Sequence, residues 1–220
     1  MYPFTYQRVG GIDEAVAALK ADPDAKLLAG GMTLLPSMKH RLAAPSSLID
    51  IGRVADLRGI RRDGLGLVVG AGMRHGEVAT DATVRAALPA LAALAGQIGD
   101  PQVRARGTLG GSVANNDPAA DYPAAVLACR AEIATDRRAI AADDFFQGLF
   151  TTALAADELL IAIRFDCPRR AAYAKFAHPA SGYAMTGVFV AEFDDGVRVA
   201  VTGAGPGVFR WQPAEQALSR

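Results

Sequence analysis

Apolar positions in the first 53 residues alternate between short continuous runs and helical spacings. Ala15, Val16 and Leu19 share one face of a helix that is expected to begin at Asp13. Pro36 falls in the first turn of a second expected helix, where its missing N–H costs little. The expected order is strand, helix, strand, helix, strand, carried by FTYQRV, the Asp13 helix, AKLLAG, TLLPSMKHRL and SSLIDI.

The next hundred residues mix both periodicities. A turn signal at Asp63-Gly64 between two apolar stretches predicts a β-hairpin within residues 57–72. Helical spacing follows, and it restarts after Pro89. Further along, the expected elements are a glycine-rich loop at 107–123, a helix at 122–129, a strand at 131–135, and a helix and strand pair that ends at 158–165.

The last 50 residues alternate apolar and polar positions with period two, which is typical of antiparallel strands. The expected strands lie at 172–177, 183–193 and 197–205, with a turn at 194–196, and a helix covers 213–220. The whole pattern predicts an α+β fold. We expect three parts: an N-terminal lobe at 1–53, a middle lobe at 54–168 and a C-terminal antiparallel sheet domain at 169–220.

Composition narrows the class of protein. The 220 residues are 51% apolar and carry 23 basic and 23 acidic side chains, so we expect no nucleic-acid partner. No apolar run reaches the ~18 residues of a membrane helix, and the N-terminus lacks a signal-peptide pattern, so we expect a cytoplasmic protein without a membrane span. Cys129 and Cys167 stand apart and are expected to be buried thiols. The three histidines show no metal-ligand spacing, so no metal site is expected.

Two glycine pairs are the main chemical signal. AGGMT (29–33) and GTLGGSVANNDP (107–118) each follow structured segments and are followed by small hydroxyl or amide residues. Glycines let a ligand approach the backbone, and successive N–H groups in such a turn form an anion nest. Converging segments of this kind suit a pyrophosphate, with Thr108, Ser112 and Asn115 as side-chain donors. A Gly-Gly pair is also a common tight turn, so both interpretations stand at this point.

Other nucleotide-binding and catalytic motifs are absent or incomplete. The chain has no GxxxxGK[ST] and no GxSxG. VTGAGPGVF resembles a dinucleotide fingerprint, but Val208 replaces the third glycine. We predict no catalytic residues. Cofactor-type loops without an acid, base or nucleophile cluster indicate redox chemistry that a cofactor carries out itself.

Three segments together resemble the flavin subunit of the molybdenum hydroxylases: LLAGGMTLLPSMKHRLAAPSSLIDI, DPQVRARGTLGGSVANNDPAADYPA and DELLIAIRF. These subunits are the medium chains of the carbon monoxide dehydrogenase and xanthine dehydrogenase type, and the similarity is colinear over essentially the whole chain. The resemblance implies a two-lobed FAD-binding fold of the p-cresol methylhydroxylase and vanillyl-alcohol oxidase type. Members of the family continue into a C-terminal helical region, so the C-terminal domain is expected to be truncated.

The resemblance also implies the residues that bind FAD. One pyrophosphate segment would consist of Leu28, Ala29, Gly30, Gly31, Met32, Thr33 and Leu34. The other would consist of Thr108, Gly110, Gly111 and Ser112, with Asn115 close behind. Met32 and Ser112 stand where well-known members have histidine and asparagine. Both segments would bind chiefly through the backbone.

Four further positions match flavin contacts of the family. Asp121 matches an acidic residue that contacts the flavin, although by itself it reads as the N-cap of the following helix. Leu160 matches a position near the adenine or the ring system, and Lys175 matches a flavin-side lysine. Tyr183 matches an aromatic residue beside the isoalloxazine. Without the resemblance these three would be a core leucine, a solvated lysine and a packing tyrosine.

The function that the resemblance implies is electron transfer in a heterotrimer. A large chain would hold the molybdenum cofactor and a small chain the iron–sulfur clusters, and this chain's FAD would pass electrons to an acceptor such as NAD. The lack of cluster-ligating cysteines fits that division. Two alternatives stay open. One is a self-sufficient flavin oxidoreductase of the enolpyruvyl-reductase type, and the other is a nucleotide-binding or assembly module without flavin.

Overall fold

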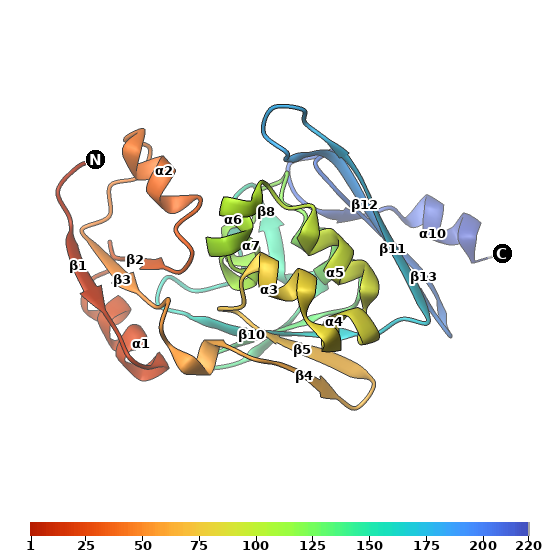
Figure 1. Cartoon of the computed structure of the whole chain (residues 1–220), viewed down its shortest axis with the longest axis horizontal. Coiled ribbons are helices and arrows are strands. Elements are labelled where there is room, and N and C mark those ends of the chain that lie inside the picture. Colours follow the sequence, from red (N-terminus) through yellow and green to blue (C-terminus); the bar gives the residue numbers. More distant parts are fainter. Residues whose placement is uncertain (220) are drawn as a thin grey trace.

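The computed structural model describes residues 1–219, and its three main sheets follow one another along the longest axis of the molecule (Figure 1). The first sheet is parallel, with strand order β1-β3-β2. The predicted alternation of strands and helices is confirmed in this part. The elements are β1 (Thr5–Arg8), α1 (Ile12–Ala21), β2 (Lys26–Leu28), α2 (Leu34–Lys39) and β3 (Ser47–Asp50).

The second sheet is antiparallel, with strand order β4-β5-β10-β6-β7. The predicted hairpin at Asp63-Gly64 is confirmed, and Gly64 takes a positive φ of 57° there. A short 3-10 helix, η1 (Ala55–Leu57), leads into the sheet. Its strands are β4 (Ile60–Asp63), β5 (Gly66–Gly70), β6 (Glu132–Thr135), β7 (Ala139–Ala141) and β10 (Leu160–Asp166).

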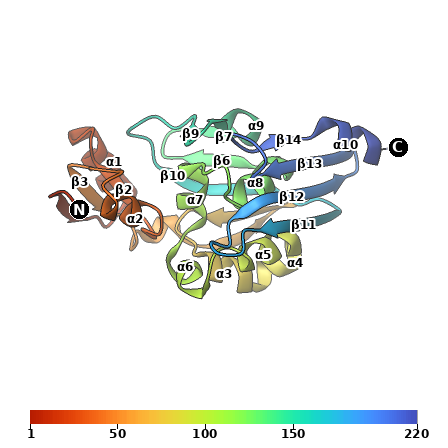
Figure 2. The ribbon, with the colours of Figure 1, turned by 90° about the horizontal axis from the view of Figure 1, so that it is seen from above.

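Six short helices lie between β5 and β6 in the chain (Figures 1 and 2). They are α3 (His75–Thr80), α4 (Ala82–Ala87), α5 (Pro89–Gly96), α6 (Pro101–Arg106), α7 (Leu109–Asn115) and α8 (Tyr122–Ala128). Of these, α4 and α7 pack on this sheet, α5 and α8 pack on the third sheet, and α3 packs on α5 and α6. After β7 the chain forms α9 (Ala142–Phe145) and a two-stranded hairpin, β8 (Phe146–Gly148) and β9 (Thr151–Thr152).

The third sheet is the predicted antiparallel one, with order β11-β12-β13-β14. The three predicted strands are confirmed, together with the turn between Phe193 and Gly196 that joins the second strand to the third. The elements are β11 (Arg170–Ala177), β12 (Ala184–Phe193), β13 (Gly196–Thr202), β14 (Phe209–Arg210) and α10 (Gln212–Leu218). Arg220, the last residue of the helix predicted at 213–220, lies outside the described residues.

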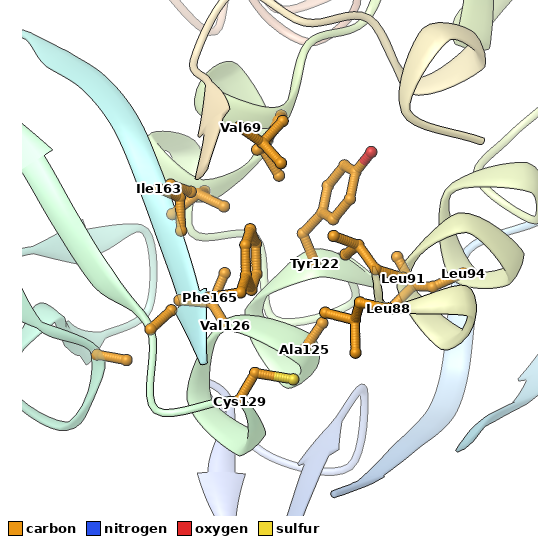
Figure 3. Packing of buried hydrophobic residues seen from close by; sticks show 14 of the residues in the cluster. Val69, Leu88, Leu91, Leu94, Tyr122, Ala125, Val126, Cys129, Ile163 and Phe165 are labelled. Atoms are coloured by element: carbon orange, nitrogen blue, oxygen red, sulfur yellow. The ribbon is translucent and has the colours of Figure 1, made fainter. Parts of the chain in front are cut away.

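Buried apolar side chains form two cores. The smaller one belongs to the N-terminal lobe and includes Ala15, Leu19 and Ile49, with Leu159 added from just before β10. The larger one joins the second and third sheets around α8, whose seven residues are all buried. Figure 3 shows Tyr122 and Val126 of α8 inside this larger core. The smaller core is shared across the lobe boundary, since Val54, Leu57 and Leu159 belong to it, whereas the larger core contains no residue of 1–53.

The segment 107–123 was expected to be a glycine-rich loop before a helix at 122–129; the helix is confirmed, but the expectation of a loop is wrong. The segment contains α7 and the start of α8, and Leu109, Gly110 and Val113 are buried. The Leu109 N–H donates to Met73 O at 2.9 Å and the Gly110 N–H donates to Ala71 O at 2.8 Å. These bonds tie the segment to the end of β5, and the small side chains permit that close contact.

Two further observations bear on the composition-based expectations. Cys129 is fully buried as expected, whereas Cys167 is only half-buried and lies 3.2 Å from the Arg62 guanidinium. Over residues 1–219, no helix is both long enough and apolar enough to cross a membrane.

Candidate functional site

The first glycine segment, Gly30–Thr33, lies between β2 and α2 and leaves its main-chain donors open. No described residue accepts a hydrogen bond from the N–H groups of Gly30, Gly31, Met32 or Thr33. Gly31 has a φ of +73°, and Thr33 is in the right-handed helical region. A positive φ at one residue next to right-handed ones is typical of an anion nest, and Gly31 and Thr33 are compatible with that geometry.

The two glycine segments meet, as the sequence predicts. A Cβ on Gly30 would collide with the Arg106 carbonyl oxygen and lie 2.8 Å from the Gly107 Cα. A Cβ on Gly111 would lie 4.0 Å from the Ala29 Cβ. Gly30 is therefore required for the N-terminal lobe to approach the start of the second segment. In Figure 1 the connection from β2 to α2 faces α6 and α7.

The second glycine segment, Gly107–Ser112, has already used most of its donors. The Gly111 N–H donates to the Thr108 hydroxyl at 3.1 Å, and the Ser112 N–H donates to Thr108 O at 3.0 Å. Since Leu109 and Gly110 donate to the end of β5, a free strip of amides is not present in this segment. Thr108 acts as the N-cap of α7 and accepts a hydrogen bond, where the sequence reasoning made it a donor.

Packing explains the glycines of the second segment. A Cβ on Gly110 would lie 2.5 Å from the Ala71 Cβ, and a Cβ on Gly107 would lie 2.5 Å from His75 Nε2. His75 is buried, and its ring faces that of Tyr122 at a centroid distance of 5.3 Å. Burial and then the charge of Arg104 lower the pKa of His75 to about 4, so the imidazole is neutral beneath this segment at neutral pH.

The end of α7 contains a residue that the sequence reasoning missed. Asn116 is fully buried with a φ of 45°, and its Nδ2 donates to Gly148 O at 2.8 Å and to Thr151 O at 2.7 Å. It therefore fixes the β8–β9 hairpin against the second segment. The predicted Asn115 beside it is half-buried. The Asn-Asn pair was a usable signal, because asparagine tolerates the left-handed region that ends a helix.

Asp121, just before α8, is joined to Lys175 of β11 in a buried ion pair. The Lys175 Nζ lies 2.9 Å from Asp121 Oδ1 and 3.1 Å from Oδ2, and it also donates to Gln97 O at 3.0 Å. Only 2% of the Lys175 side chain and 5% of the Asp121 side chain are exposed. The structure thus brings two predicted residues together, and it excludes the readings that they have without the resemblance: Lys175 is not solvated, and Asp121 makes no side-chain cap on α8.

Tyr173 completes this group and was also missed. Its hydroxyl donates to Asp121 Oδ1 at 2.6 Å. Burial raises the pKa of Asp121, and the hydrogen bonds from Tyr173 and Lys175 oppose that rise. Burial together with the Asp121 charge raises the pKa of Tyr173, so its hydroxyl keeps its proton. The signal was the alternation in β11, where Tyr173 and Lys175 both point inward with period two.

Tyr183, in the connection from β11 to β12, links this group to the first segment. Burial and the charges of Asp117 and Asp121 raise the pKa of Tyr183, and the Thr33 side chain acts in the opposite sense. This burial is partial, since 45% of Tyr183 is exposed. One edge of the molecule therefore holds the open amides of Gly30–Thr33, an aromatic ring and a buried carboxylate.

The remaining predicted residues are apolar. Leu28 and Leu34 flank the first segment and are half-buried, and the Met32 side chain is exposed. Leu160 starts β10 and is buried in the larger core. Its expected place near the cofactor stays a prediction.

Comparisons with known proteins identify the family of this chain. Residues 2–167 match the family described as the FAD binding domain in molybdopterin dehydrogenase. The carbon monoxide dehydrogenase medium chain of Hydrogenophaga pseudoflava is 39% identical over 228 residues, covering 98% of this chain and 79% of that one. The nicotine 6-hydroxylase medium subunit of Paenarthrobacter nicotinovorans is 36% identical over 225 residues, covering 97% and 79%.

A solved structure shows the same fold. In the carbon monoxide dehydrogenase from Hydrogenophaga pseudoflava that lacks the Mo-pyranopterin moiety of the molybdenum cofactor, one chain superimposes with a TM-score of 0.94 at 40% identity. The match covers 99% of this chain and 81% of that one. The resemblance seen in the sequence is confirmed: this chain belongs to the FAD-binding medium subunits of the molybdenum hydroxylases, which makes it an oxidoreductase subunit whose cofactor is FAD.

Proposed function

We propose that the chain is the electron-transfer subunit of a heterotrimeric molybdenum hydroxylase and that it holds FAD where the N-terminal lobe meets α6 and α7. Electrons would arrive from iron–sulfur clusters in a small partner chain, after substrate oxidation at the molybdenum cofactor of a large one. They would leave to an acceptor such as NAD. The relatives' names support this assignment, since they are medium chains or subunits of dehydrogenases and hydroxylases.

The observation that carries the proposal is the set of four consecutive open amides at Gly30–Thr33. A diphosphate needs hydrogen-bond donors without a bulky side chain in front of them, and this segment offers them. Gly30 allows the second segment to close on the first, and the second segment adds the Thr108 N–H, which also has no acceptor among residues 1–219. The residues present therefore fit the diphosphate of FAD.

The other predicted residues suit the two ends of the cofactor. Asp121 would offer a carboxylate acceptor to the flavin ring, with Lys175 behind it, and Tyr183 would lie beside the ring. Leu28, Leu34 and Leu160 would supply apolar contact, and Ser112 and Asn115 would add polar contact near the second segment. This placement implies the two-lobed p-cresol methylhydroxylase type of fold, with lobes at 1–53 and 54–168 and a sheet domain from 169.

FAD supplies chemistry that no side chain here can supply, because it accepts electrons singly and releases them as a pair. The chain's own residues bind and orient it. Backbone donors would stabilise the diphosphate charge by hydrogen bonds without using a side chain, and the buried Asp121–Lys175 pair would supply a fixed dipole to the ring.

A flavin removal and return experiment tests the proposal. The intact complex is stripped of FAD and given its substrate. We expect the iron–sulfur absorbance still to bleach while reduction of the acceptor is lost, and added FAD to restore it. Acceptor reduction by the flavin-free complex would contradict the proposal. Turnover of a small substrate by the isolated FAD-loaded chain would favour a self-sufficient oxidoreductase instead.

A titration separates flavin recognition from nucleotide recognition. The chain without FAD is titrated with FAD and with ADP, which carries the same diphosphate and adenosine. We expect FAD to bind more tightly, because only FAD reaches Asp121 and Tyr183. Equal affinity for the two would mean that the ring is not recognised, which would favour a nucleotide-binding module.

A further inference from the structure

The buried group around Asp121 contains one member to which neither the sequence nor the family resemblance assigns a role. Tyr173 donates its hydroxyl to Asp121 Oδ1 at 2.6 Å, which is the length of a strong hydrogen bond to a charged acceptor. Lys175 contacts the same carboxylate through both oxygens. Tyr173 and Lys175, both on the inward face of β11, therefore bind the Asp121 carboxylate just before α8.

The neighbouring strand is built to admit the Tyr173 hydroxyl. Gly187 of β12 pairs with Lys175 in the sheet register. A Cβ on Gly187 would lie 2.5 Å from the Tyr173 hydroxyl oxygen and 2.9 Å from Thr202 Cγ2. Any side chain at this position would push the phenol away from Asp121. The bare glycine in the middle of a long strand, where glycine is otherwise unfavourable, is explained by this approach.

Asp121, Lys175 and Tyr173 differ in the number of hydrogen-bond donors and acceptors that they have left for a ligand. An ammonium group has three donors, and Lys175 directs its Nζ at both Asp121 oxygens and at Gln97 O. It keeps none for a ligand. The Asp121 carboxylate has about four acceptor positions and uses two at Oδ1 and one at Oδ2. Asp121 can therefore accept from a ligand, while Lys175 and Tyr173 act on the ligand only through Asp121.

We propose that Tyr173 is a positioning residue for the cofactor, which fixes the orientation and the negative charge of the Asp121 carboxylate against the FAD. The inference rests on the proposed function, since it needs the flavin ring to face Asp121. Lys175 alone would leave the carboxylate free to rotate about its own axis, because an ammonium attracts either oxygen equally. The phenol distinguishes Oδ1 from Oδ2.

The ionisable groups that face Asp121 are few. Tyr173 and Lys175 come from β11, Tyr183 from the β11–β12 connection and Tyr122 from α8, while α5 contributes only the Gln97 carbonyl. Loss of the Tyr173 hydroxyl removes one of the interactions that oppose the rise in the pKa of Asp121. The carboxyl would then hold its proton to a higher pH, and less negative charge would face the ring.

Tyr173→Phe tests the proposal, and Tyr122→Phe is its matched control. Both remove one buried phenol oxygen, but the Tyr122 hydroxyl has no partner among residues 1–219. We expect Tyr173→Phe to weaken FAD binding about tenfold, since a hydrogen bond to a charged group is lost. The reduction potential of bound FAD should become more positive, because reduction adds negative charge to the ring. Tyr122→Phe should change neither quantity.

The pH dependence of thermal stability gives a readout without FAD. A carboxyl whose folded-state pKa is raised stabilises the folded state below its unfolded pKa, and this contribution is lost as the pH rises through the folded pKa. Tyr173→Phe extends that loss to higher pH. The difference in melting temperature between wild type and Tyr173→Phe should therefore grow from pH 4 to pH 8, while the difference for Tyr122→Phe stays constant.

Asp121→Asn separates failure of this inference from failure of the proposed function. If Asp121→Asn changes the FAD affinity and potential while Tyr173→Phe behaves like Tyr122→Phe, the role of Tyr173 is overturned and the FAD site stands. If neither Asp121→Asn nor Tyr173→Phe changes them, the flavin ring does not face Asp121, and the proposed placement fails with the inference. If both change them, the proposal is supported.

Discussion

The two glycine segments look alike in the sequence and do different things in the structure. Gly30–Thr33 keeps four N–H groups without a described acceptor, and its backbone is open to a ligand. In Gly107–Ser112 the N–H groups of Leu109, Gly110, Gly111 and Ser112 all donate within the protein. The first segment has the open amides that we propose bind the diphosphate, and the second is arranged to pack.

The difference shows that a glycine can be required either for its backbone conformation or for the space that a side chain would fill. Gly31 is needed for its positive φ, while Gly110 is needed because Ala71 leaves no room for a Cβ. The second segment is rigid because it is tied to β5, and the first is then closed against it through Gly30. A cofactor at this junction would accept hydrogen bonds from the first segment, and the second segment would hold the first in place.

Gly30→Ala should have the largest effect. The added Cβ collides with the Arg106 carbonyl, so the N-terminal lobe must move away from α6. Because the larger core contains no residue of 1–53 and is left unchanged, we expect FAD binding to weaken more than folding stability falls. Loss of two charge-assisted hydrogen bonds corresponds to about 4 kcal/mol, or about a thousandfold in Kd, measured by FAD titration.

Gly11→Ala is the control for this substitution. Gly11 has an extended backbone and no atom within 4 Å of an added Cβ. We expect its FAD affinity to match wild type. Wild-type affinity in Gly30→Ala would mean that the two segments need not touch for FAD to bind.

Lowering the pH should reduce the folding stability through His75, which packs against the second segment. The pKa of His75 is lowered from 6.5 to about 4, so its contribution to folding is complete above pH 6.5 and is lost as the pH falls through about 4. That shift corresponds to about 3 kcal/mol of unfolding free energy, measured by denaturant unfolding between pH 7 and pH 4. His75→Phe should flatten the profile, and His40→Gln, at an exposed position, should leave it unchanged. Parallel profiles for wild type and His75→Phe would contradict this account.

Gly110→Ala should lower the folding stability more than the FAD affinity, which is the opposite of the result expected for Gly30→Ala. Its Cβ enters the contact with Ala71 at 2.5 Å, so the buried packing of α7 against β5 is strained. Overpacking of this kind costs about 2 kcal/mol of folding stability. We expect a lower melting temperature with FAD affinity reduced about tenfold or less below the transition. A melting temperature equal to wild type, with FAD binding abolished, would mean that Gly110 serves the ligand directly.

Local patterns sufficed for much of the fold. The strand and helix order of residues 1–53 follows from hydrophobic periodicity, and Asp63-Gly64 specifies its hairpin by turn chemistry. The glycines of 107–111 misled the sequence reasoning, because a glycine that is needed for tight packing looks the same as one that forms a turn. The contact with Ala71 that distinguishes them joins residues 39 apart in the chain.

The candidate site was also predictable only in part. The first segment and its meeting with the second were predicted from the glycine pairs. Asp121 was read as an N-cap and Lys175 as solvated when taken alone, because each is neutralised by a partner more than 50 residues away. Tyr173 had no motif at all, although its inward position in an alternating strand beside Lys175 was visible. Ion pairs between residues far apart in the chain cannot be predicted from the local pattern of a single sequence.

Amide hydrogen exchange with and without FAD tests the central claim most directly. The amides of Gly30–Thr33 lack acceptors in the folded chain, so they should exchange fast without FAD and slow markedly when FAD or ADP is bound. The amides of Leu109 and Gly110 should be slow in both states, since they already donate to Met73 and Ala71. Unchanged exchange at Gly30–Thr33 on FAD binding would show that this segment does not hold the diphosphate.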